Sequence, residues 1–265
     1  MSDFVMNQDP SPLGTTTPAV PDVEALLVKA RALFADKEQE RGTPEAPTQA
    51  GFLALARAGK DVWNAWRKEY PEPMPNFSGV DFRGDAAVDF SKFSFTGGGR
   101  DKEEEIIYCV NFTSCTFGDE ARFEGAQFGD WARFAGAQFG DWARFNGARF
   151  GHHARLEGAQ FGDWAWFNGT QFGEDARFDG AQFGDWARFN GAQFGDDASF
   201  DGAQFGDWAS FEAWDVSRIQ NFWKKMRNKE FAQQRTSYAE AHGLRSDAFH
   251  SISFRGTEFL DDVSF

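Results

Sequence analysis

The stretch FGDWARFNGAQ, residues 183–193, recurs with few changes along the middle of the chain. From Phe112 to Phe211 a phenylalanine, replaced once by Leu156, returns at spacings that alternate between five and six residues. A short fixed period is typical of stacked repeat proteins, in which no unit buries its apolar face without its neighbours. The sequence therefore predicts a shape more clearly than an activity.

Each unit has the pattern of a very short strand followed by a turn. Ala stands two places before most of the phenylalanines, as Ala132 does before Phe134, so the two side chains share one face of an extended segment. The Gln or Arg between them points outward, and the glycine-containing residues that follow turn the chain at a corner. A helix is excluded, because apolar positions five and six apart form no continuous stripe on a helical cylinder.

The corners indicate how many units make one coil. When the third positions of the longer corners are compared every eleven residues, their residue types are irregular. When they are compared every twenty-two residues, they separate into a uniform set and a mixed set. The short corners separate in the same way, with asparagine on one and acidic residues on the opposite one. We therefore expect four strands and twenty-two residues per coil. The uniform set is Trp142, Trp164, Trp186 and Trp208; the mixed set is Trp131, His153, Asp175 and Asp197; the short corners carry Asn146, Asn168 and Asn190 or Glu157, Asp179 and Asp201.

The predicted fold class is mainly β, a four-sided β-solenoid whose interior holds four columns of phenylalanine and four columns of alanine. Neighbouring coils should lie ~4.8 Å apart, joined by main-chain hydrogen bonds. An aromatic side chain buries ~150–250 Å². The phenylalanine columns alone therefore supply the apolar burial that folding requires.

These units resemble the pentapeptide-repeat family, whose consensus places a small residue, a polar residue and a central Leu or Phe on each five-residue side. The resemblance covers about half of the chain through Phe211 and implies a right-handed quadrilateral β-helix. The chain departs from the consensus by one extra residue at every second corner. This departure leaves the geometry of those corners open.

The rest of the chain predicts an entry region and an insertion around the repeats. Helical patterning runs from Val23 to Ala35 and from Phe52 to Tyr70. The segment from Gly59 to Phe82 resembles the entry segment often seen ahead of pentapeptide repeats, and Trp63 and Trp66 are expected to cover the open end of the first coil. The predicted parts are a disordered tail over 1–20, a helical entry segment over 21–76, the solenoid over 77–212 with a loop at about 97–106, a helical insertion over 213–245 and a resumed coil over 246–265.

The first and last coils are recognised by the same phenylalanine spacing. The last phenylalanine that follows this spacing, Phe265, is the final residue of the given sequence, so no capping segment follows it there. Because exposed ends of solenoids are normally capped, we expect self-association through this last coil or a longer protein. First coils are predicted at Phe77, Phe82, Phe90 and Phe95, and resumed repeats at Phe249, Phe254, Phe259 and Phe265.

Charge and composition narrow the classes of partner. The formal net charge is −14, which disfavours direct binding to nucleic acid or to an anionic membrane. The chain has no apolar run of membrane-spanning length and no secretory signal pattern. Cys109 and Cys115 are too far apart for a CxxC motif. Cys115 takes the inward small-residue position before Phe117 and is expected to be a buried reduced thiol, consistent with a cytoplasmic location.

The titratable residues do not indicate an enzyme. His152 and His153 share one corner, and a metal site there needs Glu174 or Asp130 from a neighbouring coil, so a solvated corner is the simpler interpretation. His242 and His250 are isolated from any nucleophile or acid at a recognisable spacing. We expect no catalytic, cofactor-binding or metal-binding residues and no cofactor.

The function predicted is a structural scaffold or protein–protein interaction module whose partner is unknown. The candidate surface is the column Trp142, Trp164, Trp186 and Trp208 with Arg144 and Arg188, because outward aromatic residues in a row are typical of interface anchors. Two alternatives are that the column only forms a cation–π ladder with these arginines, or that the helical insertion covers it. The family resemblance implies a further alternative, since some members mimic DNA and inhibit type II topoisomerases.

Overall fold

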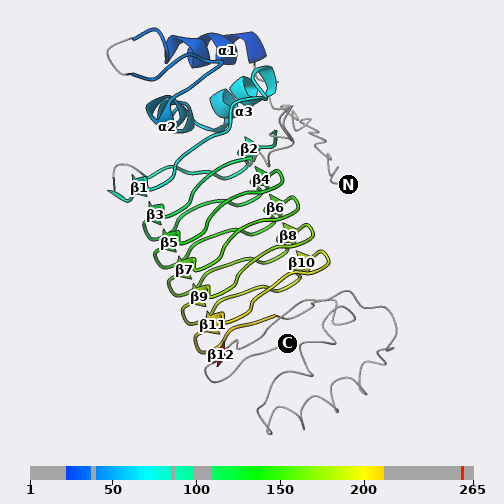
Figure 1. The fold of residues 1–265 in the computed structure, drawn as a ribbon. Coiled ribbons are helices and arrows are strands. Elements are labelled where there is room, and N and C mark those ends of the chain that lie inside the picture. Colours follow the sequence, from blue (N-terminus) through cyan, green and yellow to red (C-terminus); the bar gives the residue numbers. More distant parts are fainter. Residues whose placement is uncertain (1–21, 37–39, 85–86, 98–108, 212–257, 260–265) are drawn as a thin grey trace, which may run out of the picture.

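The computed structural model describes residues 22–36, 40–84, 87–97, 109–211 and 258–259 as three helices followed by stacked parallel strands. Helices α1 (Val23–Ala32), α2 (Gln49–Arg57) and α3 (Lys60–Glu69) lie together at one end of the stack (Figure 1). The predicted tail over 1–20, the helical insertion over 213–245 and nearly all of the loop at about 97–106 fall outside the described residues. None of the described helices is long and apolar enough to cross a membrane.

The helices begin and end at residues suited to those positions. The Asp22 carboxylate accepts the N–H groups of Glu24 and Ala25 at the start of α1. The helical patterning from Phe52 to Tyr70 corresponds to two helices, because the chain breaks between α2 and α3 at Gly59, whose φ is +93°. Glycine adopts this backbone conformation without the steric cost that a Cβ imposes, and the chain changes direction there.

Two sides of the solenoid are sheets of two-residue parallel strands. The strands of a sheet pair one coil apart in register, so that Gln138 and Phe139 lie beside Gln160 and Phe161. Figure 1 shows the two sheets as two columns on opposite sides of the stack. The first sheet contains β1 (Asp81–Phe82), β3 (Thr116–Phe117), β5 (Gln138–Phe139), β7 (Gln160–Phe161), β9 (Gln182–Phe183), β11 (Gln204–Phe205) and β12 (Glu258–Phe259). The second contains β2 (Ser94–Phe95), β4 (Gln127–Phe128), β6 (Arg149–Phe150), β8 (Gln171–Phe172) and β10 (Gln193–Phe194).

The other two sides are ladders of single parallel bridges. One ladder contains the pair Arg133 and Arg155, and the other the pair Arg144 and Trp166, again one coil apart. The sequence separation across every coil from Asn111 onward to Phe211 is twenty-two residues. The predicted parallel β-solenoid with four strands per coil is therefore confirmed.

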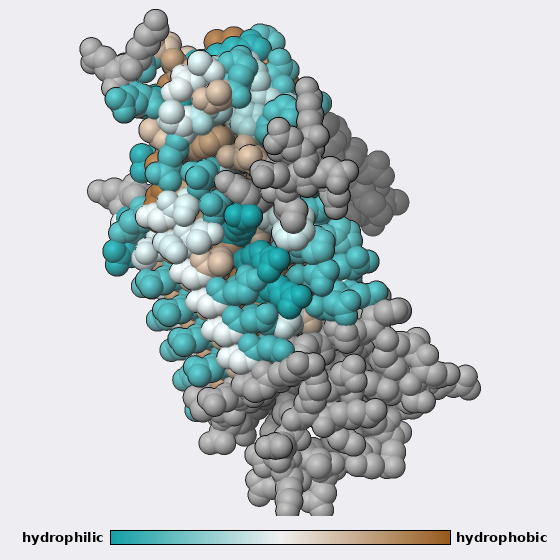
Figure 2. All heavy atoms as spheres, in the orientation of Figure 1, coloured by the Kyte–Doolittle hydropathy of each residue, from teal (hydrophilic) through white to brown (hydrophobic). Residues whose placement is uncertain are grey.

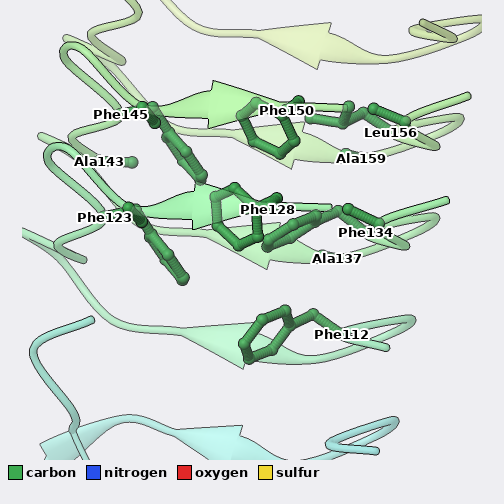
Figure 3. Packing of buried hydrophobic residues seen from close by; sticks show 14 of the residues in the cluster. Phe112, Phe123, Phe128, Phe134, Ala137, Ala143, Phe145, Phe150, Leu156 and Ala159 are labelled. Atoms are coloured by element: carbon green, nitrogen blue, oxygen red, sulfur yellow. The ribbon is translucent and has the colours of Figure 1, made fainter. Parts of the chain in front are cut away.

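The core consists of phenylalanine rings stacked directly above one another. The Phe123 and Phe145 rings are parallel within 3° at 4.7 Å, and Phe145 stacks on Phe167 at 4.9 Å. Figure 3 shows neighbouring columns side by side, with Leu156 taking the ring position above Phe134. Most small-residue positions hold fully buried alanine, as predicted. Phe93, Val110, Cys115 and Thr170 take these positions in individual coils.

The extra residue at every second corner adopts a left-handed backbone conformation. Its φ lies between 55° and 64° at each of these corners, although the residue is never glycine. From Glu120 to Trp186 its N–H donates to a carbonyl of the next coil, as Trp142 does to Asp163 at 2.8 Å. The extra residue thus continues the inter-coil hydrogen bonds around the corner, which settles the geometry that the family resemblance left open. The residues are Glu120, Trp131, Trp142, His153, Trp164, Asp175, Trp186, Asp197 and Trp208.

The entry helices close the first coil with two tryptophans. Trp63 is fully buried with its ring 5.2 Å from that of Phe95, and its indole N–H donates to the Ser94 carbonyl at 2.8 Å. Trp66, also fully buried, donates to the Pro44 carbonyl at 2.9 Å. Both indoles therefore satisfy their polar group. Trp63 covers the open end of the phenylalanine columns, and Trp66 packs against Trp63 at 5.3 Å.

Candidate interaction surface

The four tryptophans of the uniform corner form one continuous stack, which we call the Trp column. Trp142 stacks on Trp164, and Trp164 on Trp186, each pair at 4.9 Å with planes 2° apart. Trp186 stacks on Trp208 at 5.2 Å and 10°. The rings follow the coil spacing because each stands at the same corner of successive coils.

The Trp column presents indole edges to the solvent. Trp142 is 38% exposed and Trp208 is 49% exposed, whereas Trp164 and Trp186 between them are half-buried. Stacking covers the ring faces of the inner members, so their accessible parts are ring edges. Tryptophan combines a large apolar contact area with an indole N–H donor.

The corner does not require tryptophan. Trp142, Trp164, Trp186 and Trp208 have φ between 61° and 64°, a conformation that disfavours an L-residue by roughly 1–2 kcal/mol. The opposite long corner adopts it with Asp175 and Asp197, whose side-chain type tolerates it better. Stacking offsets part of the strain at the Trp column, at about 0.5–1.5 kcal/mol per aromatic pair. The turn geometry therefore does not explain why this corner is aromatic.

The residues that follow the Trp column on the adjacent side form its Arg flank, which we define as Arg144, Trp166 and Arg188. The Arg188 guanidinium lies over Trp164 at 5.5 Å and over Trp166 at 6.0 Å. Arg144 lies over Trp166 at 5.6 Å and reaches Glu120 at 3.5 Å, so among the described rings it contacts this indole and not the column itself. Of the two arginines assigned to the column, the structure thus brings one onto it.

Sequence reasoning missed Trp166. It occupies the outward position where the coils above and below carry Arg144 and Arg188, and its ring packs edge-on against Trp142 at 5.7 Å. Its indole nitrogen is buried without a hydrogen-bond partner. The signal was present in the sequence as the one tryptophan in a column of arginines, but it stood outside the uniform corner set.

The residues that precede the Trp column form its Asp flank, Asp141, Asp163 and Asp185. Each uses Oδ1 to accept the backbone N–H of the aspartate one coil further on, at 2.9 Å from Asp163 and from Asp185 and at 2.8 Å from Asp207. These carboxylates therefore have a structural role in joining coils. The Trp column lies between a carboxylate ladder on one side and a guanidinium-bearing side on the other.

The histidine corner is held together in a similar way. His153 stacks on Trp131 at 4.1 Å and lies 3.3 Å from an Asp175 oxygen. His152 accepts the Glu174 N–H through Nδ1 at 3.1 Å, and the His152 N–H donates to Asp130 at 2.8 Å. Among the described residues, no group of three or more His, Cys, Asp or Glu side chains is arranged to hold a metal ion.

The acidic side of the solenoid is interrupted by ion pairs. Arg155 contacts Glu157 at 2.9 Å, and Arg177 contacts Asp179 at 3.7 Å and Asp175 at 3.9 Å. Each side chain is part-exposed, so these pairs contribute ~0–1 kcal/mol apiece. Their effect is to break the negative potential along this side into alternating charges.

The second sheet carries an open groove on its outer surface. The groove has a volume of about 490 Å³ and is lined by Gln127, Arg149, Gln171 and Gln193 with the edges of the adjacent phenylalanines. Its polar side-chain groups are amides, the Thr96 hydroxyl and one guanidinium, and none of these is a carboxylate or an imidazole. On the face that Figure 2 shows, hydrophilic residues form regular rows along the described coils.

Comparison with known proteins agrees with the repeat pattern. The family model described as pentapeptide repeats, with nine copies, matches residues 108–149 and 167–215. No curated protein and no solved structure matches the chain.

Proposed function

The repeat region of this chain belongs to the pentapeptide-repeat family, and on that premise we propose that the protein is a non-enzymatic scaffold that binds a protein partner through the Trp column. The observation that carries the proposal is the strained, exposed stack of Trp142, Trp164, Trp186 and Trp208. The turn does not require tryptophan, because the opposite corner adopts the same backbone conformation with Asp175 and Asp197. Residues held in strained backbone conformations concentrate at functional positions.

A protein partner fits the chemistry of the column. Tryptophan and arginine dominate the energetics of protein interfaces, where an aromatic ring fills a pocket and its polar edge finds an acceptor. Stacking immobilises Trp164 and Trp186 before binding, because each ring is held between two others. Less side-chain entropy is then lost on association.

Several observations support a non-enzymatic role. The aspartates of the corners accept backbone N–H groups, and His152 does the same, so these groups are engaged in joining coils. Burial raises the pKa of the Cys109 thiol to about 12 and also that of Cys115 to about 12, which keeps both in the unreactive protonated form. In the described part of the chain, titratable side chains spread along the rod and do not converge on one cavity.

The alternative of a DNA-mimicking rod that inhibits a type II topoisomerase needs a continuous array of negative charge. The ion pairs Arg155–Glu157 and Arg177–Asp179 alternate with the carboxylates on the acidic side. The Asp flank is accompanied, on the other side of the Trp column, by Arg144 and Arg188. These charges favour the scaffold over the mimic.

A capture experiment with the full chain tests the proposal. The double variant Trp164→Ala, Trp186→Ala is compared with the wild type for the proteins each retains from an extract of the source cells. The matched control is Trp131→Ala, which removes a tryptophan of the same left-handed conformation from the opposite corner. We expect the double variant to lose the specific partner and the control to keep it. Equal recovery by the double variant would remove the Trp column as the binding site.

A further inference from the structure

We infer that the Trp column binds a second copy of this chain, with the two solenoids side by side and pointing in the same direction. This inference rests on the proposed function of the Trp column and names its partner. The contact would be isologous, so each residue of the surface meets its own equivalent or that of a neighbouring position across a two-fold axis. Three features of the described coils support it, namely the exposed indole edges, the common coil spacing and the charges of the two flanks.

The flanks are opposite in charge. In the coils of Trp142, Trp164 and Trp186 the aspartate comes before the tryptophan and the outward Arg or Trp166 comes after it, so the Asp flank and the Arg flank lie on different sides of the Trp column. Arg188 makes no ion pair with a carboxylate among the residues that the structure describes. Its guanidinium lies over the faces of Trp164 and Trp166. It can therefore pair with a carboxylate of a second molecule.

The charges select one orientation. Two rods that face each other through the Trp column can be related by a two-fold axis that runs either parallel or perpendicular to the solenoid. A parallel axis places the Asp flank of each copy against the Arg flank of the other. A perpendicular axis places the Asp flanks against each other, and juxtaposed like charges disfavour association. Electrostatic complementarity therefore favours the parallel pair.

The coil spacing extends the contact along the whole column. Trp142, Trp164 and Trp186 follow one another at 4.9 Å, and a second copy has the same spacing by identity. In the parallel pair every coil meets its equivalent coil at the same height, so contacts made at Trp164 repeat at Trp186. A partner without this period matches the column at one coil only.

Sedimentation velocity of the full chain over a concentration series tests the association. We expect the wild type to shift from monomer to dimer, Trp164→Ala, Trp186→Ala to remain monomeric, and Trp131→Ala to dimerise like the wild type. Unchanged circular dichroism of the variants shows that they are folded. A wild type that stays monomeric throughout the series overturns the inference, as does a dimer that persists in the double variant.

Disulfide cross-linking tests the orientation. Trp142→Cys and Trp208→Cys are prepared as separate variants, three coils or ~14 Å apart along the rod. In a parallel pair each variant cross-links to itself, because equivalent residues meet. In an antiparallel pair a cross-link forms only when the two variants are mixed, because a disulfide joins Cα atoms ~4.4–6.8 Å apart. Cys109 and Cys115 are fully buried and do not contribute in the folded chain. Cross-linking restricted to the mixture overturns the parallel arrangement.

Neutralising the Asp flank tests the charge argument. Asp163→Asn, Asp185→Asn keeps the oxygen that accepts the inter-coil N–H but removes the charge. We expect the dimer to weaken roughly tenfold, since the contact between Asp185 of one copy and Arg188 of the other is lost on both sides of the axis. Asp130→Asn, which has the same hydrogen-bonding role on the opposite corner, should leave the dimer unchanged. An unchanged dissociation constant for the double variant overturns the flank pairing.

The capture experiment separates the two proposals. A monomeric wild type whose capture of another protein still depends on Trp164 and Trp186 retains the proposed function and removes the second copy as the partner. A wild type that dimerises through the Trp column and captures nothing else supports the second copy as the partner. A double variant that behaves as the wild type in both experiments removes the Trp column from both proposals.

Discussion

The backbone N–H of Asp163 donates to Oδ1 of Asp141, one coil away, at 2.9 Å. The Asn168 N–H donates to Oδ1 of Asn146 in the same way at 3.1 Å. Side-chain oxygens thus take over the role of a carbonyl at corners where the main chain turns away from its neighbour. The uniform Asp and Asn positions in the sequence are explained by these hydrogen bonds and require no ligand.

The hydrogen bonds of the Asp flank predict different effects on stability for two substitutions of Asp163. Asp163→Ala leaves the Asp185 N–H without its protein acceptor, which we expect to reduce the free energy of unfolding by about 0.5–1.5 kcal/mol. Asp163→Asn keeps an oxygen in place and should reduce it much less. Thermal unfolding followed by circular dichroism compares the two variants with the wild type. Equal loss of stability in both would show that the charge, not the acceptor, matters.

The phenylalanine columns predict a strong dependence on ring volume. Phe167 is fully buried between Phe145 at 4.9 Å and Phe189 at 4.7 Å. Phe167→Ala leaves a cavity and should cost about 3–5 kcal/mol of unfolding free energy. Phe167→Leu should be mild, because Leu156 already occupies an equivalent position. Denaturant unfolding measures both, and a Leu variant as unstable as the Ala variant would contradict the packing argument.

The left-handed corners predict sensitivity to β-branched side chains. Asp175 has φ 55°, where a Val side chain clashes with the backbone. We expect Asp175→Val to lower the unfolding free energy by about 1–2 kcal/mol. Glu174→Val is the control on the neighbouring residue, which is outside the left-handed region. If the control lowers the melting temperature as much as Asp175→Val, the backbone conformation is not responsible.

Burial of the two cysteines predicts their reactivity and an alkaline limit to stability. Burial raises the pKa of Cys109 and that of Cys115 from 9.0 to about 12, and the Cys115 thiol donates to the Phe77 carbonyl at 2.8 Å. Native protein at pH 8 should therefore react with thiol reagents far more slowly than unfolded protein. From pH 9 to 12 the unfolded state loses thiol protons that the native state keeps, so stability should fall as pH rises. Rapid labelling of native protein at pH 8 would show that these sites open.

The core could be predicted from the sequence because each buried column has its own residue type. The phenylalanine spacing located the sides of the solenoid, and the contrast between Trp164 and His153 located the coil length. The packing partners of outward residues could not be predicted in the same detail. Arg144 contacts Trp166 and Glu120, because a long outward side chain can contact residues of its own coil and of the coils on either side.

The entry region shows a second limit of the pattern. Apolar residues continue at helical spacing through Gly59, so the helical pattern from Phe52 to Tyr70 does not reveal the break between α2 and α3. A glycine within a helical pattern is often tolerated. Its left-handed φ depends on how Trp63 and Trp66 pack against the first coil, which is a tertiary contact that local spacing does not contain.

The interior of the solenoid repeats every eleven residues, whereas its outer surface repeats every twenty-two. A duplication or loss of eleven residues would therefore leave the phenylalanine columns continuous but carry every later surface residue to the opposite corner, so that Trp186 would no longer stand below Trp142. A change of twenty-two residues would lengthen or shorten the rod by one coil and keep each column straight. Tandem duplication can thus lengthen the phenylalanine core in steps of eleven residues. It keeps the surface columns continuous only in steps of a whole coil of twenty-two residues.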